Sequence, residues 1–131
     1  MSKLGLCRQA LIAAGIGALT MLQACGDCVS IGVSGIAVTV IDAATHNAPE
    51  SVPSLRVTDG AYVEIQTKPS SQAELPVLYA ASEREGVYQV LVSAQGYRDF
   101  SVDGVRVSRE SGSCRALKTV KITASLERIQ R

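Results

Sequence analysis

Two cysteines, Cys25 and Cys28, stand in a C-x-x-C spacing within the stretch LQACGDC. This spacing fits a redox-active dithiol or half of a zinc site, and it also fits two cysteines with unrelated roles. The compartment decides among these interpretations, because disulfides persist in oxidising environments and are rare in the cytosol. The residues that precede the pair indicate which compartment applies.

The first residues have the features of an export signal. Lys3 and Arg8 give a basic start, and residues 10–22 form an apolar run of thirteen residues that only Thr20 interrupts. That length suits a signal-peptide core, whereas a membrane-spanning helix needs roughly 20 residues. A buried N-terminal helix is the alternative, and the glycines at positions 5, 15 and 17 disfavour it. The sequence predicts a signal-peptide helix over residues 1–24.

The four residues that complete this segment, Leu22-Gln23-Ala24-Cys25, resemble the bacterial lipobox. The resemblance implies that the Cys25 sulfur carries a diacylglycerol, that cleavage precedes Cys25, and that acyl chains such as palmitate anchor the mature protein. Several chains anchor firmly, since each buried methylene contributes about 0.8 kcal/mol and one chain alone is marginal. Gly26 follows the cysteine, where an aspartate would favour the inner membrane. We therefore expect a cell-envelope lipoprotein, at the outer membrane if the host is Gram-negative.

Composition limits the partners. Cleavage before Cys25 would remove Lys3 and Arg8 and no acidic residue, leaving eleven basic residues against twelve acidic ones. The net charge would fall from +1 to −1, so nucleic-acid binding, which needs a basic surface, is not expected. The chain has no Trp and a single Phe, so it has few aromatic side chains with which to build a surface that stacks against carbohydrate rings. The expected partners are the membrane, through the lipid, and a protein of the envelope.

After Cys28 the apolar residues alternate with a period of two, which is typical of β-strands. Asp59-Gly60 separates two such runs and indicates a hairpin. The 107 residues after residue 24 make one ordinary domain. The pattern predicts an all-β fold, an antiparallel Greek-key β-sandwich of about seven strands. We expect these strands at residues 35–42, 55–58, 61–66, 76–80, 86–93, 100–107 and 117–126.

Three features resemble the carboxypeptidase regulatory-like domains, which are small β-sandwiches of the transthyretin (prealbumin-like) type. Residues 40–45, VIDAAT, precede a proline-containing loop in which His46-Asn47 stands where the family usually has glycine. Residues 86–97, GVYQVLVSAQGY, match the family pattern G-x-Y-x-V-x-V-x-A-x-G-Y, and Cys114 precedes a final strand rich in Thr and Val. Such domains are mostly non-catalytic, and the resemblance implies a module that contributes stability or contacts.

The chain is poorly equipped for catalysis. His46 is the only histidine, which excludes a multi-histidine zinc site, and no serine stands in a G-x-S-x-G context. A transthyretin-like hydrolase of purine catabolism relies on several histidines and a conserved tail, whereas this chain ends ERIQR. We therefore expect a non-enzyme with no metal and no cofactor. A small hydrolase of this kind is the alternative.

A group of basic residues gives the C-terminal third of the chain a positive character. The simplest interpretation is charge on a solvent-facing surface. The alternative is a contact surface for anionic lipid headgroups or for an acidic partner, with Arg106, Arg109 and Arg115 as its candidate residues.

The remaining cysteines can pair. Cys7 leaves with the signal peptide and the lipid occupies Cys25, so Cys28 and Cys114 are left in an oxidising compartment. A disulfide between them would close a loop of about 87 residues and contribute about 4–5 kcal/mol in the chain-entropy model. The alternative is two free thiols. In this interpretation the C-x-x-C spacing is a short tether between a lipid and the fold.

The sequence thus divides the chain into a signal peptide at residues 1–24, a lipidated N-terminus and tether at 25–33, and a carboxypeptidase regulatory-like sandwich at 34–131. It predicts a lipid-anchored, non-enzymatic binding or structural module. An alternative role is a component of an envelope assembly or secretion system with a transthyretin-like fold.

Overall fold

A computed structural model describes residues 32–70, 73–112 and 114–130 of the chain. The signal-peptide helix expected over residues 1–24 and most of the expected tether lie outside the described residues. Within the described residues, no helix is long and apolar enough to cross a membrane.

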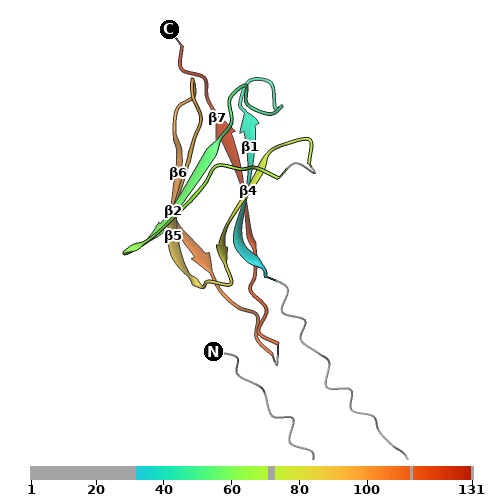
Figure 1. The fold of residues 1–131 in the computed structure, drawn as a ribbon, viewed down its shortest axis with the longest axis vertical. Helices are drawn as coiled ribbons and strands as arrows, with labels where there is room; N and C mark the ends of the chain where they lie inside the picture. Colours follow the sequence, from blue (N-terminus) through green and yellow to red (C-terminus); the bar gives the residue numbers. More distant parts are fainter. Residues whose placement is uncertain (1–31, 71–72, 113, 131) are drawn as a thin grey trace, which may run out of the picture.

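The described residues form seven strands in two sheets. Figure 1 shows how the strands are arranged. A three-stranded sheet has the order β4-β1-β7, and a four-stranded sheet has the order β3-β2-β5-β6. The all-β sandwich expected from the sequence is confirmed. The strands are β1 (Ser34–Asp42), β2 (Ser54–Asp59), β3 (Tyr62–Gln66), β4 (Val77–Ser82), β5 (Gly86–Ser93), β6 (Phe100–Val107) and β7 (Val120–Leu126).

The core lies between the two sheets because alternate residues of each strand point inward. In β5, Tyr88, Val90 and Val92 are at most 1% exposed, while their neighbours face outward. Full burial of one such aliphatic side chain contributes about 1.5–3 kcal/mol. The period of two seen in the sequence is therefore the pattern of a half-buried sheet. The other core side chains are Ile36, Val38, Val40, Leu55, Val57, Leu78, Ala80, Ala81, Tyr97, Val105, Val107, Leu117, Ala124 and Leu126.

The strand connections follow a Greek-key path. β2 and β3 form a hairpin, β3 lies against β4 of the other sheet, and β5 returns to pair with β2. The expectation of purely antiparallel pairing is wrong at one place, since β1 and β7 run parallel, with Val38 opposite Ile122. No tight turn joins these two strands, because they are the first and last of the fold, so a hairpin does not impose their relative direction.

Two glycines shape the four-stranded sheet. Gly60, with φ of 57°, closes the β2–β3 hairpin at the expected Asp59-Gly60 turn. Gly104, with φ of 69°, lies in β6 where the register with β5 shifts between Tyr88 and Val90. The shift marks a β-bulge, so the sequence Asp103-Gly104 introduces a bulge inside one continuous strand.

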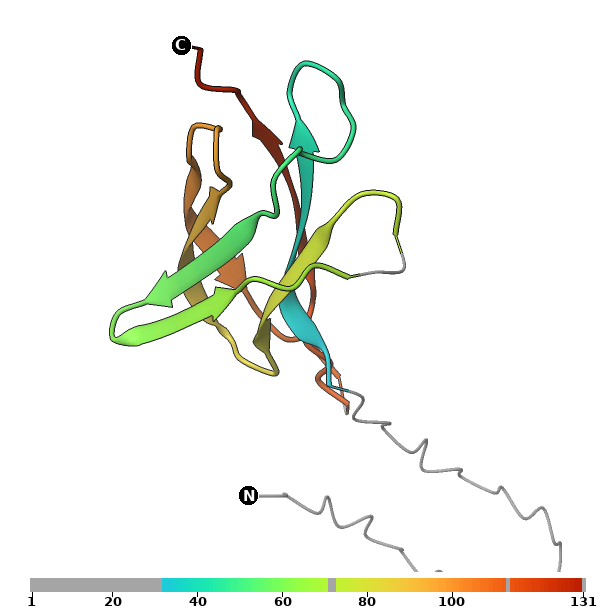
Figure 2. The same cartoon turned by 45° about the horizontal axis from the view of Figure 1, so that its top comes forward.

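The sandwich has two distinct ends. At the N-terminal end, the chain enters β1 beside the β4–β5 turn, and Thr119 donates a hydrogen bond of 2.8 Å to the Ser34 carbonyl. The loop end lies at the opposite end of β1, as Figure 2 shows. It carries the β1–β2 loop (43–53), the β3–β4 connection (67–70 and 73–76), the β5–β6 loop (94–99) and the C-terminal segment (127–130).

Candidate functional site

The carboxylate of Asp42 organises the loop end. This last residue of β1 is 1% exposed, and both of its carboxylate oxygens accept hydrogen bonds. Oδ2 accepts from the Tyr97 hydroxyl and from Arg128 Nε, each at 2.8 Å. Oδ1 accepts from the backbone N–H groups of Ala44 at 2.8 Å and Thr45 at 3.2 Å. The buried charge is thus fully satisfied, as burial of a carboxylate requires.

These hydrogen bonds hold Asp42 in its ionised form. The bond from Arg128 lowers the pKa of the carboxyl well below its usual range, and the bond from Tyr97 and the two backbone N–H groups act in the same direction. Burial opposes them and is outweighed. A carboxylate with so low a pKa is a poor proton acceptor near neutral pH, so Asp42 is not suited to act as a general base.

The same contacts fasten three chain segments together. The Tyr97 hydroxyl accepts a hydrogen bond of 3.1 Å from the Glu50 N–H, and Arg128 Nη2 lies 3.0 Å from a Glu50 carboxylate oxygen. The C-terminal segment also joins the β5–β6 loop, because the Ile129 N–H donates to the Gly96 carbonyl at 2.9 Å. The β1–β2 loop, the β5–β6 loop and the C-terminal segment therefore form one connected surface.

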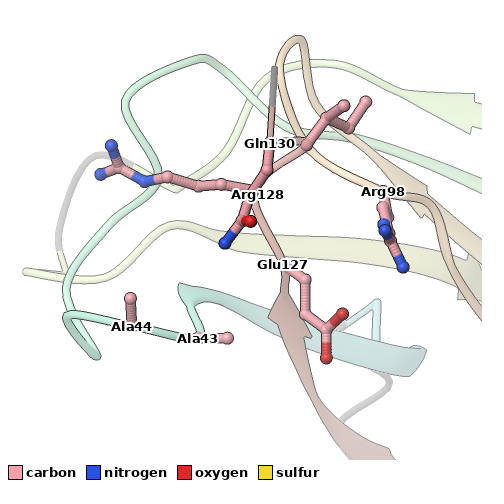
Figure 3. A pocket seen from close by; sticks show the side chains of 7 residues that line it. Ala43, Ala44, Arg98, Glu127, Arg128 and Gln130 are labelled. Atoms are coloured by element: carbon pink, nitrogen blue, oxygen red, sulfur yellow. The ribbon is translucent and has the colours of Figure 1, made fainter.

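An open hollow of about 700 Å³ lies beside this network. In Figure 3, the Arg98 and Arg128 side chains extend to opposite sides of it. Arg128 is already engaged by Asp42 and Glu50. The lining contains no His, Cys, Ser or Tyr, and its charged side chains are Arg98, Glu127 and Arg128. The residues that line it are Ala43, Ala44, Arg98, Glu127, Arg128, Ile129 and Gln130.

The single histidine stands in the β1–β2 loop near this network. His46 has a φ of 59°, and its backbone N–H donates to the Asp42 carbonyl at 2.8 Å. Its side chain is exposed. Within residues 32–70, 73–112 and 114–130, no group of three His, Cys, Asp or Glu side chains is arranged to hold a metal ion.

The three candidate contact arginines lie in two different parts of the structure, on β6 and at the N-terminal end. Arg106 is exposed on the outer face of β6, opposite Val87 of β5. Arg109 and Arg115 lie together at the N-terminal end, where Arg109 donates to the Arg115 carbonyl at 3.2 Å. Arg109 also donates to the Glu83 carbonyl at 3.0 Å and lies 3.5 Å from its carboxylate. Its charge is thus partly balanced inside the fold, and the contact-surface hypothesis stays a prediction.

Three cysteines were assigned to sites, and of these only Cys114 lies within the described residues. It is disulfide-bonded, and its partner lies outside the described residues. Cys25 and Cys28 also lie outside them, so lipidation of the first and pairing of the second with Cys114 stay predictions. Cys114 belongs to the connection between β6 and β7, which reaches the N-terminal end where β1 begins.

A second cluster, at the N-terminal end, was not expected from the sequence. Arg84 Nη1 donates to the Tyr88 hydroxyl at 2.8 Å and to Asp59 at 3.0 Å. The guanidinium carbon of Arg84 also lies 4.0 Å from the centre of the Tyr62 ring, a cation–π contact. From the sequence alone, Glu83 and Glu85 on either side of Arg84 are interpreted as a solvated charged turn. Nothing local in the sequence shows that Arg84 contacts the β2–β3 hairpin.

An inward-pointing carboxylate adjoins this cluster. Glu64 of β3 accepts hydrogen bonds from the Tyr62 hydroxyl at 2.6 Å, from Gln66 Nε2 at 2.9 Å and from the Ala81 N–H at 3.2 Å. Burial works to raise the pKa of Glu64, but these bonds outweigh it and the pKa is lowered. The bond to Glu64 also raises the pKa of Tyr62 to about 12. Glu64 therefore links the edge of one sheet to the other.

Comparison with known proteins does not assign the chain to a family. No protein-family model and no curated protein matches it. The likeness to carboxypeptidase regulatory-like domains therefore rests on the sequence motifs alone and enters the proposal below.

Proposed function

We propose that this chain is a lipid-anchored, non-enzymatic β-sandwich of the bacterial envelope, related to the carboxypeptidase regulatory-like domains. It would be held to the membrane through Cys25 and would present its loop end as a binding or structural surface. The observation that carries the proposal is the placement of the Asp42 network at the end of the sandwich opposite the start of β1.

The placement of the Asp42 network matters because the proposed lipid anchor, Cys25, precedes β1 by only a few residues. Seven peptide units separate Cys25 from Gly32. They span at most about 25 Å when fully extended. A lipid on Cys25 would therefore keep the N-terminal end near the membrane surface, and the loop end would point toward the surrounding compartment.

The construction of the loop end supports a contact role. Asp42, Tyr97 and Arg128 hold three segments together, so the surface is ordered before any partner arrives and less entropy is lost on binding. Two large apolar side chains at this end are exposed, Val52 at 70% and Ile129 at 54%. Loops on a rigid scaffold commonly carry the contacts of β-sandwich domains.

Prolines stiffen the neighbouring part of the loop end. The four prolines of the chain, Pro49, Pro53, Pro69 and Pro76, all line one shallow hollow of about 260 Å³ between the β1–β2 loop and the β3–β4 connection. Each proline fixes its own φ and reduces the freedom of the loop. Val52 stands in the same lining. The hollow therefore presents a preformed, largely apolar surface.

The anchor is tested by replacing Cys25 with alanine in the full chain produced in a Gram-negative bacterium. We expect the wild-type chain in the membrane fraction, with a mature N-terminus at Cys25 whose mass includes the lipid. Cys25→Ala should leave the unprocessed precursor or a soluble product. Cys7→Ala is the matched control, since that cysteine would leave with the signal peptide. A wild-type chain that keeps residues 1–24 or carries no lipid contradicts the anchor.

The contact role is tested by capture of envelope proteins on the full chain. Val52→Asp and Ile129→Asp change exposed apolar residues of the loop end, and each should abolish the capture of a specific partner. Val87→Asp is the matched control, because Val87 is 45% exposed but lies on the outer face of β5. Loss of capture with Val87→Asp and not with the loop-end variants would place the contact elsewhere.

A further inference from the structure

The four-stranded sheet leaves one edge unpaired among the described residues. β3 forms its only backbone ladder among the described residues with β2, so its other edge is unpaired. Its outward side chains are apolar and exposed, Val63 at 48% and Ile65 at 61%. Soluble proteins usually protect sheet edges with charges or bulges. The opposite edge strand, β6, has both features, an outward Arg106 and the bulge at Gly104.

The hairpin geometry shows which backbone groups are free. Asp59 and Tyr62 are register partners across the two-residue turn Gly60-Ala61, a position where the pair is hydrogen-bonded. Hydrogen-bonded and non-hydrogen-bonded pairs alternate along an antiparallel ladder. The N–H and C=O groups of Val63 and Ile65 therefore point away from β2. Each of these two residues offers one donor and one acceptor to another strand.

A second copy of β3 fits this edge in one register. A shift of one residue would place outward side chains opposite inward ones, so a symmetric pair must be centred on a residue. Centres at Val63, Glu64 and Ile65 are those that pair at least three residues of β3 with β3 of the second copy. Centring on Glu64 sets two carboxylates directly opposite each other, which is unfavourable. Centring on Val63 places Ile65 opposite Ala61, inside the turn, where the ladder ends.

Centring on Ile65 avoids both problems. Ile65 then faces Ile65 of the second copy on the outer surface, and Val63 faces Thr67. Glu64 faces Gln66, and Tyr62 faces Lys68, which like Thr67 stands just beyond the end of β3 and is exposed. With the chain extended through these two residues, the ammonium of Lys68 would lie diagonal to the Glu64 carboxylate. The sequence YVEIQTK over residues 62–68 is thus complementary to itself about Ile65 in both charge and polarity.

We propose that two copies of this chain associate by antiparallel pairing of β3 about Ile65, which joins their four-stranded sheets into one sheet of eight strands. The contact is a single strand edge, well below the area of roughly 1,200 Å² that stable complexes bury, so the dimer is weak at low concentration. The association does not depend on the lipid. A common membrane surface would raise the local concentration of the two copies and strengthen it.

A cysteine trap in the full chain, produced in intact cells, tests the pairing. Directly opposite Cα atoms of a hydrogen-bonded pair lie about 5.5 Å apart, within the range of a disulfide. Ile65→Cys should give a covalent dimer on mild oxidation, seen on a non-reducing gel. Val87→Cys, at a site that is 45% exposed on the inner strand β5, should stay monomeric. An Ile65→Cys dimer no more abundant than that of Val87→Cys overturns the proposal.

Mixed pairs test the register. When a Val63→Cys chain and a differently tagged Thr67→Cys chain are produced together, a mixed disulfide should form. Val63→Cys alone should not form one, because its two copies are offset by four residues, about 13 Å. Adding Ile65→Lys to both chains should abolish the mixed disulfide, whereas adding Val87→Lys should leave it. Crosslinking of Val63→Cys with itself as strong as with Thr67→Cys contradicts this register.

Discussion

Arg128 Nε lies 2.8 Å from Oδ2 of Asp42 and so joins the C-terminal segment to the end of the first strand. The pair spans 86 positions of the sequence, and the Tyr97 hydroxyl donates to the same oxygen. Because β1 and β7 run side by side in parallel, both strands end at the loop end, which brings Arg128 within reach of Asp42. The parallel pairing of the first and last strands is therefore what assembles this site.

The Tyr97 hydroxyl should contribute measurably to stability. Tyr97→Phe keeps the buried ring but leaves the Glu50 N–H without its acceptor and removes one donor from Asp42. We expect a loss of about 1–3 kcal/mol in the free energy of unfolding, measured by urea titration. Tyr79→Phe is the matched control, since Tyr79 is 48% exposed and should tolerate the change. Equal effects of the two variants would show that the hydroxyl of Tyr97 does not matter.

Acid should destabilise the fold through Asp42. The pKa of this carboxyl is lower in the folded chain than its value of about 3.9 in unfolded chains. Its contribution is therefore complete above about pH 5 and is lost as the pH falls below about 4, because the unfolded state then binds more protons. Urea midpoints measured between about pH 7 and pH 3 should fall for the wild-type chain.

Asp42→Asn separates this effect from general acid sensitivity. The variant should be less stable near neutral pH, since an amide at this position lacks the charge that pairs with Arg128, and its stability should fall less on acidification. A smaller acid dependence should persist, because the pKa of Glu64 is also lowered. Asp99→Asn, an exposed site in the β5–β6 loop, is the control. An acid dependence of Asp42→Asn identical to that of the wild-type chain would contradict the assignment.

The sequence was sufficient for the strands and for the faces they bury. Alternation of apolar residues in segments such as 86–93 directly reflects which side chains point inward, so β5 begins and ends where the pattern predicts. The alternation of apolar residues does not show whether two strands far apart in the chain run parallel or antiparallel. For this reason the parallel pairing of β1 and β7 was missed. Leu117, expected to open the last strand, instead stands in an isolated bridge opposite Arg109.

The polar clusters could not be found from the sequence for a related reason. Asp42 and Tyr97 were noted as members of motifs, but their contact joins residues 55 positions apart. Likewise Arg84 meets Asp59 only because the β4–β5 turn and the β2–β3 hairpin lie at the same end of the sandwich. Local periodicity assigns a residue to a face of a sheet, and the partner across the fold depends on the topology.

Alkali should act on the opposite end of the molecule. The pKa of Tyr62 is raised to about 12, chiefly by its hydrogen bond to Glu64. Because its pKa in unfolded chains is about 10, the stability it contributes is complete below about pH 10 and is lost as the pH rises toward 12. The phenolate absorbance of the wild-type chain should include a component near pH 12 that is missing in Tyr62→Phe. If the component that Tyr62→Phe removes titrates near pH 10 instead, the Tyr62–Glu64 bond is contradicted.

The partner of Cys114 can be identified directly. Cys114 is disulfide-bonded, and the sequence assigns Cys28 as its partner. Non-reducing peptide mapping of the mature chain should join the peptides that carry these two residues. Cys28→Ser and Cys114→Ser should each lower the free energy of unfolding by up to about 4–5 kcal/mol. The double variant should be no less stable than either single one, because one bond is lost in all three. A Cys114 peptide joined to a different cysteine, or a double variant with the summed loss of both singles, would contradict the pairing.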